Sequence, residues 1–157
     1  MKKLRVLLCV VMAAGLALLA GCGSSGEAVD ADAKTIGSDL LQKITYADEM
    51  TEMDLDTALM IINLSDVNIT DSAIYESTGA TAEEIVVLKC ASSDDAKKAS
   101  EAFKTRVSEQ KESYQDYVPE ELTKLNAAVI ATSGNFAVLS VSDDPDTAKS
   151  IISEYLK

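Results

Sequence analysis

Histidine and tryptophan are both absent from this chain of 157 residues. Without histidine, the chain lacks the commonest general base at neutral pH and the commonest protein ligand of zinc and copper. Any catalysis would need carboxylates, lysine or serine alone. The sequence also lacks the G-x-S-x-G pattern of a nucleophile elbow and a glycine-rich phosphate loop. We therefore expect a protein that is not an enzyme and that holds no cofactor and no metal.

Basic residues are the scarcer charge, with 14 Lys and Arg against 26 Asp and Glu. Lys2, Lys3 and Arg5 all precede the first acidic residue. From residue 22 onward the chain has 11 basic and 26 acidic residues, a formal charge of −15. Phosphate binding needs clustered Lys and Arg, so we expect no nucleic-acid partner. Peripheral attachment to anionic lipid is disfavoured for the same reason.

The beginning of the chain has the pattern of a secretory signal, because residues 6–20 carry no charge and follow three basic residues. This apolar run of 15 residues is shorter than the roughly 20 that a membrane-crossing helix needs. It ends in Leu19, Ala20, Gly21 and Cys22, which together resemble the lipobox of a bacterial lipoprotein precursor. The alternative is an ordinary secretory signal with a chance cysteine.

The lipobox resemblance implies that the Cys22 thiol receives a diacylglyceryl group and that the preceding peptide bond is cut. Two acyl chains anchor a protein stably, whereas a single chain binds a membrane only marginally. We therefore expect residues 1–21 to be a signal peptide and residues 22–30 to be the lipidated cysteine and a flexible tether. We expect residues 31–157 to form a single α+β domain that is held on the outer face of the cell membrane.

The three cysteines have different expected fates. Cys9 is removed with the signal peptide, and Cys22 is consumed by the lipid. Cys90 lies in an apolar segment and has no thiol or histidine to pair with. The mature domain therefore has no intramolecular disulfide, and we expect Cys90 to be a small buried hydrophobe.

Apolar periodicity predicts an N-terminal helix followed by two ββα units. The predicted segments are a helix to about residue 45, a short helix near 55–62, strands at 72–77 and 84–91, a long helix from Ser92 or Ser93, a short helix from Pro119, strands at 127–132 and 136–142, and a helix from Pro145. The acidic stretch 48–56 is expected to be irregular. The simplest product is one four-stranded antiparallel sheet with the helices packed on one face.

Two further groups of residues are candidates for binding. Asp54 and Asp56 resemble a fragment of a calcium loop, but the further ligands, the glycine and the closing glutamate are missing. A solvated acidic loop is the favoured interpretation. Tyr114, Tyr117 and Phe136 are a candidate binding surface, since tyrosines near a helix end can line one. Packing over the sheet edge is the alternative for these aromatic residues.

Three stretches of the domain read EIVVLK (84–89), YQDYVPE (114–120) and GNFAVLSVSDD (134–144). They resemble a family of small lipoproteins and secreted proteins of Gram-positive, mostly anaerobic bacteria, which is catalogued only as a domain of unknown function. The resemblance covers about residues 32–157. It implies the fold, the anchor and a Gram-positive setting, and it brings no catalytic residue with it.

These features predict a lipid-anchored extracytoplasmic domain that binds a protein, peptide or envelope component through an acidic surface. An accessory solute- or cation-binding lipoprotein is the alternative, although the chain is too short for the two-lobed solute-binding architecture. An enzyme that uses carboxylates alone is a third and weaker candidate.

Overall fold

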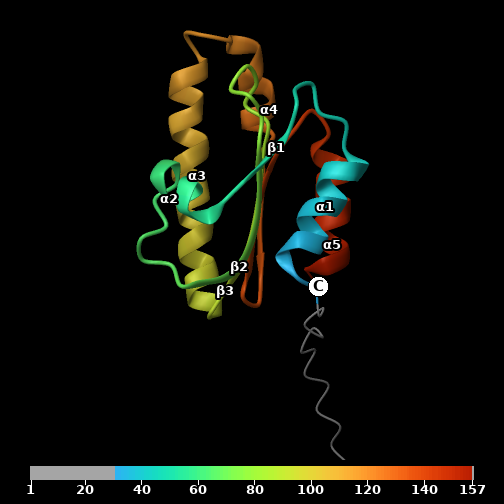
Figure 1. Cartoon of the computed structure of the whole chain (residues 1–157). Coiled ribbons are helices and arrows are strands. Elements are labelled where there is room, and N and C mark those ends of the chain that lie inside the picture. Colours follow the sequence, from blue (N-terminus) through green and yellow to red (C-terminus); the bar gives the residue numbers. More distant parts are fainter. Residues whose placement is uncertain (1–30, 157) are drawn as a thin grey trace, which may run out of the picture.

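The computed structural model describes residues 31–156 (Figure 1). The predicted signal peptide, the lipobox with Cys22 and the tether lie outside these residues. Within the described part, no helix combines the length and the apolar character that a membrane crossing requires.

Five strands form one antiparallel sheet in the order β1-β2-β3-β5-β4. The elements in chain order are α1 (Ala33–Lys43), β1 (Thr51–Met53), α2 (Leu55–Ile61), β2 (Ile69–Glu76), β3 (Glu84–Cys90), α3 (Ser93–Tyr114), the 3-10 helix η1 (Pro119–Glu121), α4 (Leu122–Asn126), β4 (Val129–Ser133), β5 (Phe136–Val141) and α5 (Pro145–Tyr155). The mixed helix and strand composition is confirmed, but the expected four strands are wrong. The fifth strand, β1, lies inside the acidic stretch that was expected to be irregular.

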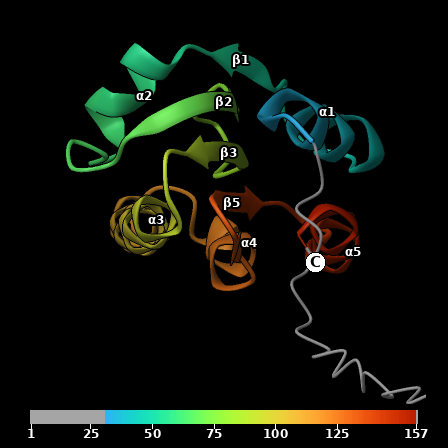
Figure 2. The same ribbon diagram turned by 90° about the horizontal axis from the view of Figure 1, so that it is seen from below.

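Helices cover both faces of the sheet, so the expectation of helices on one face is also wrong (Figures 1 and 2). We call the two faces the α3 face and the α1/α5 face. Val86 and Leu88 of β3 belong to the core of the α3 face, and Ile85 and Val87 belong to the core of the α1/α5 face. A strand that is apolar at successive positions must be covered on both sides.

The two predicted ββα units are present, but they are not equivalent. The units β2-β3-α3 and β4-β5-α5 join through the antiparallel pair of β3 and β5, while α3 and α5 lie on opposite faces. The links into the helices differ in length, with residues 91–92 before α3 and residues 142–144 before α5. Successive residues of an extended chain point to opposite faces of the sheet. The one additional linking residue before α5 is therefore consistent with α5 packing on the face opposite to α3.

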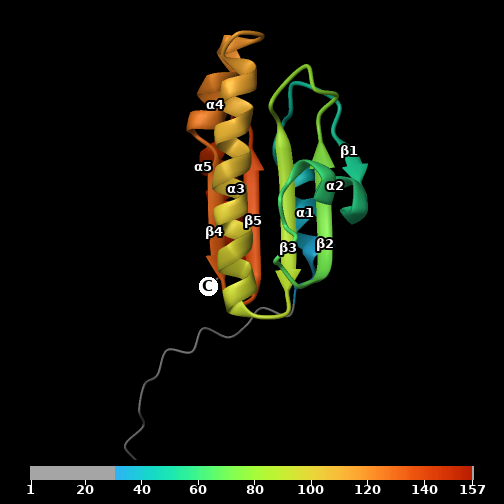
Figure 3. The same ribbon diagram turned by 90° about the vertical axis from the view of Figure 1, so that its left-hand side faces the viewer.

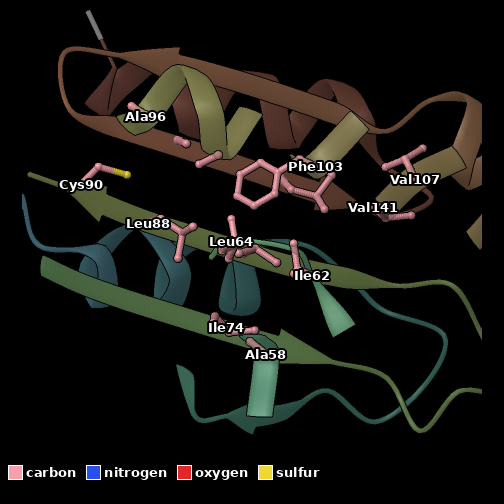
Figure 4. Close-up of a cluster of buried hydrophobic side chains, with 14 of the residues drawn as sticks. Ala58, Ile62, Leu64, Ile74, Leu88, Cys90, Ala96, Phe103, Val107 and Val141 are labelled. Atoms are coloured by element: carbon pink, nitrogen blue, oxygen red, sulfur yellow. The ribbon is translucent and has the colours of Figure 1, made fainter. Parts of the chain in front are cut away.

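The core of the α3 face is centred on Phe103, whose side chain is fully buried among residues of α3, the sheet and the segment after α2 (Figure 4). Ala96, Ala99 and Val107 share its buried side of α3, as the periodicity predicts. Cys90 lies in the same core. Burial raises the pKa of its thiol to about 11, so the prediction of a small buried hydrophobe is confirmed.

Side-chain caps fix where the helices begin. Asp32 accepts a hydrogen bond from the Thr35 N–H at 2.6 Å, and Ser92 caps α3 in the same way. Asp54 accepts from the Thr57 N–H at 2.9 Å. Asp54 is therefore the N-cap of α2, which explains its position without a calcium loop.

Helix α1 approaches β2 closely at Gly37. A Cβ atom on Gly37 would lie 2.8 Å from the Cβ of Ala73 and 3.2 Å from a ring carbon of Tyr75. The first of these distances is shorter than real Cβ atoms show, so the absence of a side chain allows the helix to pack on the sheet.

We expect Gly37→Ala to lower the free energy of unfolding by about 1–2 kcal/mol, because the overpacking cost exceeds the gain in helix propensity. Urea unfolding of the variant and the parent protein measures the change. Adding Ala73→Gly should recover part of the loss, since it removes the closest atom. A Gly37→Ala variant that is more stable than the parent would contradict this account of the contact.

Candidate functional site

The domain has two ends along strand β3, which we call the proximal end and the distal end (Figure 3). The proximal end is the end at which β3 finishes. There the Ala33 N–H donates to Asp71 Oδ2 at 2.8 Å, and Asp71 of β2 lies opposite Lys89 of β3 in the antiparallel register. The first described residues of the chain therefore lie at the proximal end. The distal end, where Glu84 begins β3, lies roughly 20 Å away at about 3.3 Å per residue.

A buried carboxylate, Glu83, organises the distal end. Its side chain is almost completely inaccessible, and its oxygens accept hydrogen bonds from the N–H groups of Ala47 and Asp48 at 2.9–3.0 Å. The Thr81 hydroxyl also donates to it at 3.1 Å. Glu83 thus ties the connection between α1 and β1 to the start of β3.

Lys124 of α4 supplies the positive charge that this carboxylate needs. Its Nζ atom lies 3.2 Å from Glu83 Oε1 and 3.1 Å from Glu121 Oε1, and its side chain is 6% exposed. Burial works to lower the pKa of Lys124, but the hydrogen bonds with Glu121 and Glu83 outweigh it and raise this pKa overall. Glu121 in turn accepts from the Ala82 N–H at 2.8 Å. Removing one member of such a buried set leaves an uncompensated charge and costs about 3–5 kcal/mol.

A second charge cluster lies on the α3 face of the same end, where Glu84 is buried and its two partners are partly exposed. Arg106 of α3 bridges Glu76 Oε1, at 2.9 Å, and Glu84 Oε2, at 3.4 Å. Within residues 31–156, the other oxygen of Glu84 has no hydrogen-bond partner. Burial raises the pKa of Glu84 to about 7; the guanidinium of Arg106 opposes this shift and the charge of Glu76 adds to it.

The outer surface of the distal end is acidic and carries two tyrosines. The Tyr114 hydroxyl donates to the carbonyl oxygens of Gly79 and Thr81, which fixes the ring against the loop before β3. The ring of Tyr117 lies 6.4 Å from it between centroids, and Tyr117 is 72% exposed. The exposed acidic residues of this end, which stand beside the lysines Lys43 and Lys111, are Glu49, Glu112, Asp116, Glu120, Asp143 and Asp144.

The structure brings together only two of the three aromatic residues that the sequence singled out. Tyr114 and Tyr117 are neighbours at the distal end, whereas Phe136 lies at the proximal end. Phe136 is buried in the core of the α1/α5 face, with Lys89 Nζ 5.3 Å from its ring centroid. Phe136 therefore does not form one surface with the tyrosines.

Sequence reasoning missed the buried charges altogether. A signal was present at Glu84, because Glu84, Val86 and Leu88 share one face of a strand by period two. An acid at such a position faces the core and needs a partner. The partners Arg106 and Lys124 come from distant helices and leave no comparable pattern in the sequence.

A groove of about 610 Å³ runs between α3 and the segment 62–67. Charged residues of both signs line it, among them Asp66, Lys98, Glu101 and Arg106. In the part of the chain that the structure describes, no three His, Cys, Asp or Glu residues are grouped as metal ligands. The groove is a polar depression lined by three acidic and two basic residues.

We expect Glu84→Gln to remove a pH-dependent loss of stability. The folded-state pKa of about 7 exceeds the ordinary value of 4.5, so the folded protein binds this proton more tightly than the unfolded chain. The contribution to stability is then complete below pH 4.5 and is lost as pH rises through about 7. Its size is on the order of 3 kcal/mol.

Urea unfolding of parent and variant, at a pH of about 5 and again at about 8, checks this expectation. The parent should lose more stability than Glu84→Gln between the two conditions. Glu120→Gln, at an exposed acid of the same end, serves as the control and should follow the parent. An equal loss in the parent and in Glu84→Gln would contradict the assignment of the proton to Glu84.

A family model described as a domain of unknown function, DUF4358, matches residues 42–142. No curated protein and no solved structure matches the chain. The matched range runs from the end of α1 to the residue after β5, so it includes every strand of the sheet and both charge clusters. The chain belongs to this family of unknown function.

Proposed function

We propose that this protein is a lipid-anchored extracytoplasmic domain of a Gram-positive bacterium that binds a basic protein, peptide or envelope component at its distal end. In this proposal Cys22 carries the lipid and the domain catalyses no reaction. Support for the anchor comes from the sequence, where Leu19, Ala20, Gly21 and Cys22 close an uncharged apolar run. Support for binding comes from the acidic surface with Tyr117.

The separation of the two ends carries the proposal. The described chain begins at the proximal end, beside Asp71 and Lys89. Eight residues separate Cys22 from Ala31, and a flexible tether of this length spans about 15 Å. The acidic distal end is the part of the domain that is most remote from the attachment point, so the anchor leaves it accessible.

The chemistry of the distal end favours a cationic partner. Exposed carboxylates attract basic groups over distances of several ångströms and speed their association, and the effect falls with salt. An exposed tyrosine ring such as that of Tyr117 can add a cation–π contact with Lys or Arg. The charge clusters around Lys124 and Arg106 hold the supporting elements in place, which reduces the ordering cost of binding.

The groove beside α3 favours a second candidate function, an accessory solute-binding lipoprotein. Its volume of about 610 Å³ falls in the range of small-molecule sites. Charged residues of both signs would suit a zwitterionic solute. The two candidates use different surfaces and can be separated by variants.

We expect Cys22→Ala to abolish lipid labelling and to leave the precursor unprocessed or to release the domain. The reason is that the thiol is the only acyl acceptor in the proposed lipobox. Metabolic labelling with palmitate measures lipid attachment. Membrane fractionation and the size of the polypeptide measure its release and its processing. Cys9→Ala is the control and should behave as the parent. A mature-sized Cys22→Ala band that remains in the membrane fraction would refute the anchor.

Charge reversal should distinguish the effect of the acidic surface on binding from the effect of the net charge of the protein. We expect Glu112→Lys, Asp116→Lys and Glu120→Lys together to weaken binding of an oligolysine peptide by at least about tenfold, which corresponds to about 1.4 kcal/mol. The control makes the same net change elsewhere, with Asp94→Lys, Glu101→Lys and Glu154→Lys.

Calorimetry with the full chain in detergent, at low and high salt, measures both variants. The control should weaken binding by about twofold, because it changes only the long-range field. Equal losses in the two variants would show that the distal end is no special site. Binding of a zwitterionic amino acid that Lys98→Gln abolishes would instead favour the groove.

A further inference from the structure

Strand β4 (Val129–Ser133) is an edge of the sheet, and no strand of residues 31–156 lies beyond it. The two-residue loop before β5 makes Ser133 and Phe136 a hydrogen-bonded pair. The alternate positions Val129 and Ala131 therefore also bond to β5. Ile130 and Thr132 direct their backbone N–H and C=O groups away from the sheet, where another strand could pair with them.

This edge lacks the usual protection against strand pairing. β4 reads Val-Ile-Ala-Thr-Ser and holds no charged residue and no proline, although charges and prolines are the devices that keep edges apart. The edge strand on the other side of the sheet, β1, has three residues and an exposed acid, Glu52. In a chain with 26 acidic residues, an uncharged edge can meet a second copy without like charges in contact.

An apolar groove of about 370 Å³ accompanies the edge. One side of the groove is β4, and the other is a stripe formed by Lys149, Ile152 and Ser153 of α5 with Leu156, the residue that caps α5. These positions are spaced three and four residues apart and share one helix face. The one charged member, Lys149, is paired with Asp146 at 3.1 Å.

We propose that β4 pairs with β4 of a second copy about a two-fold axis, which joins two five-stranded sheets into one. The pairing is antiparallel and centred on Ala131, the middle residue of β4. Ile130 of each copy then forms a hydrogen-bonded pair with Thr132 of the other, so every outward-directed group of these two residues is satisfied. Ala131 faces Ala131 of the other copy in a non-hydrogen-bonded pair, with Cα atoms about 4.5 Å apart.

The helices fit the same symmetry. A two-fold axis perpendicular to the sheet keeps α5 of both copies on one face and runs them antiparallel, so the α5 of each copy covers the groove of the other. Lys149 then approaches the carboxyl-terminal turn of the other α5, where a positive charge is favourable. A strand from an unrelated protein would satisfy the edge but would not supply this reciprocal helix contact.

The arrangement is compatible with the proposed anchor but does not depend on it. Both copies of α1 lie on the same face of the joined sheet, so both proposed anchors can attach to one membrane. On this face α1 and α5 hold three basic and three acidic residues, which are Lys34, Lys43 and Lys149 with Asp39, Asp146 and Glu154. The acidic distal ends lie at opposite extremities of the pair, each beside the proximal end of the other copy, and their outer surfaces are not part of the contact.

Disulfide cross-linking of the full chain in whole cells tests the proposal. We expect Ala131→Cys, with a mild thiol oxidant, to give at least about ten times more covalent dimer than Ala80→Cys, which samples random collisions from an exposed loop. The unsubstituted chain gives the background. The reading is the same whether the protein is in the membrane or the soluble fraction, so failure of the anchor and failure of the dimer are distinguishable.

Second-site variants identify the backbone as the contact. Thr132→Pro removes an outward N–H without breaking the pairing with β5, and it should lower cross-linking of Ala131→Cys about tenfold, whereas Thr132→Val should leave it unchanged. Thr132→Lys should act like Thr132→Pro through charge repulsion and replaces it if the proline variant does not fold. Equal cross-linking from positions 131 and 80, or indifference to both Thr132→Pro and Thr132→Lys, would overturn the proposal.

Discussion

Burial of the β3–β5 pair on both faces is the constraint on which the rest of the molecule depends. Ile85 and Val138 point to one face, and Val86 and Leu139 point to the other, so neither face can be left to water. Each buried aliphatic side chain of this size contributes roughly 1.5–3 kcal/mol. A single helical layer would leave half of this contribution unrealised, and the fold therefore needs α3 on one side and α1 with α5 on the other.

The same arrangement explains why charges are buried at the distal end. Glu83 and Glu84 sit where the central strand begins, Glu83 against α4 and residues 47–48 and Glu84 against α3, and both side chains are almost fully buried. Each acid is therefore enclosed and must be matched, by Lys124 in one case and by Arg106 in the other. Buried ion pairs add little net stability. Their geometric effect is larger, because Lys124 and Arg106 fix α4 and α3 relative to the strand and so hold the tyrosine-bearing surface above them.

The sequence was sufficient for elements that repeat a pattern and insufficient for those that do not. Helix caps and apolar stripes located α1, α3 and α5 to within a few residues, because Asp32, Ser92 and the Asp144–Pro145 pair are local signals. β1 is too short and too exposed to show alternation, so the sheet was expected to be smaller. The unbroken apolar run of β3 already indicated two covered faces, but the similarity of the two ββα units favoured a symmetric arrangement. Ion pairs between residues that are far apart in the sequence produce no periodic pattern, so the sequence did not indicate them.

Anchoring and edge pairing would reinforce each other energetically. A pairing centred on Ala131 offers about four backbone hydrogen bonds, each worth roughly 0.5–1.5 kcal/mol net, together with the apolar groove along α5. For free molecules such a contact is weak, since association costs at least about 4 kcal/mol in lost freedom. Attachment to a membrane removes part of that cost, because it confines both copies to a thin layer and raises their effective concentration as a linker does. An uncharged edge that joins only part of the copies in solution would therefore join more of them at a surface, where the proposed lipid attachment places them.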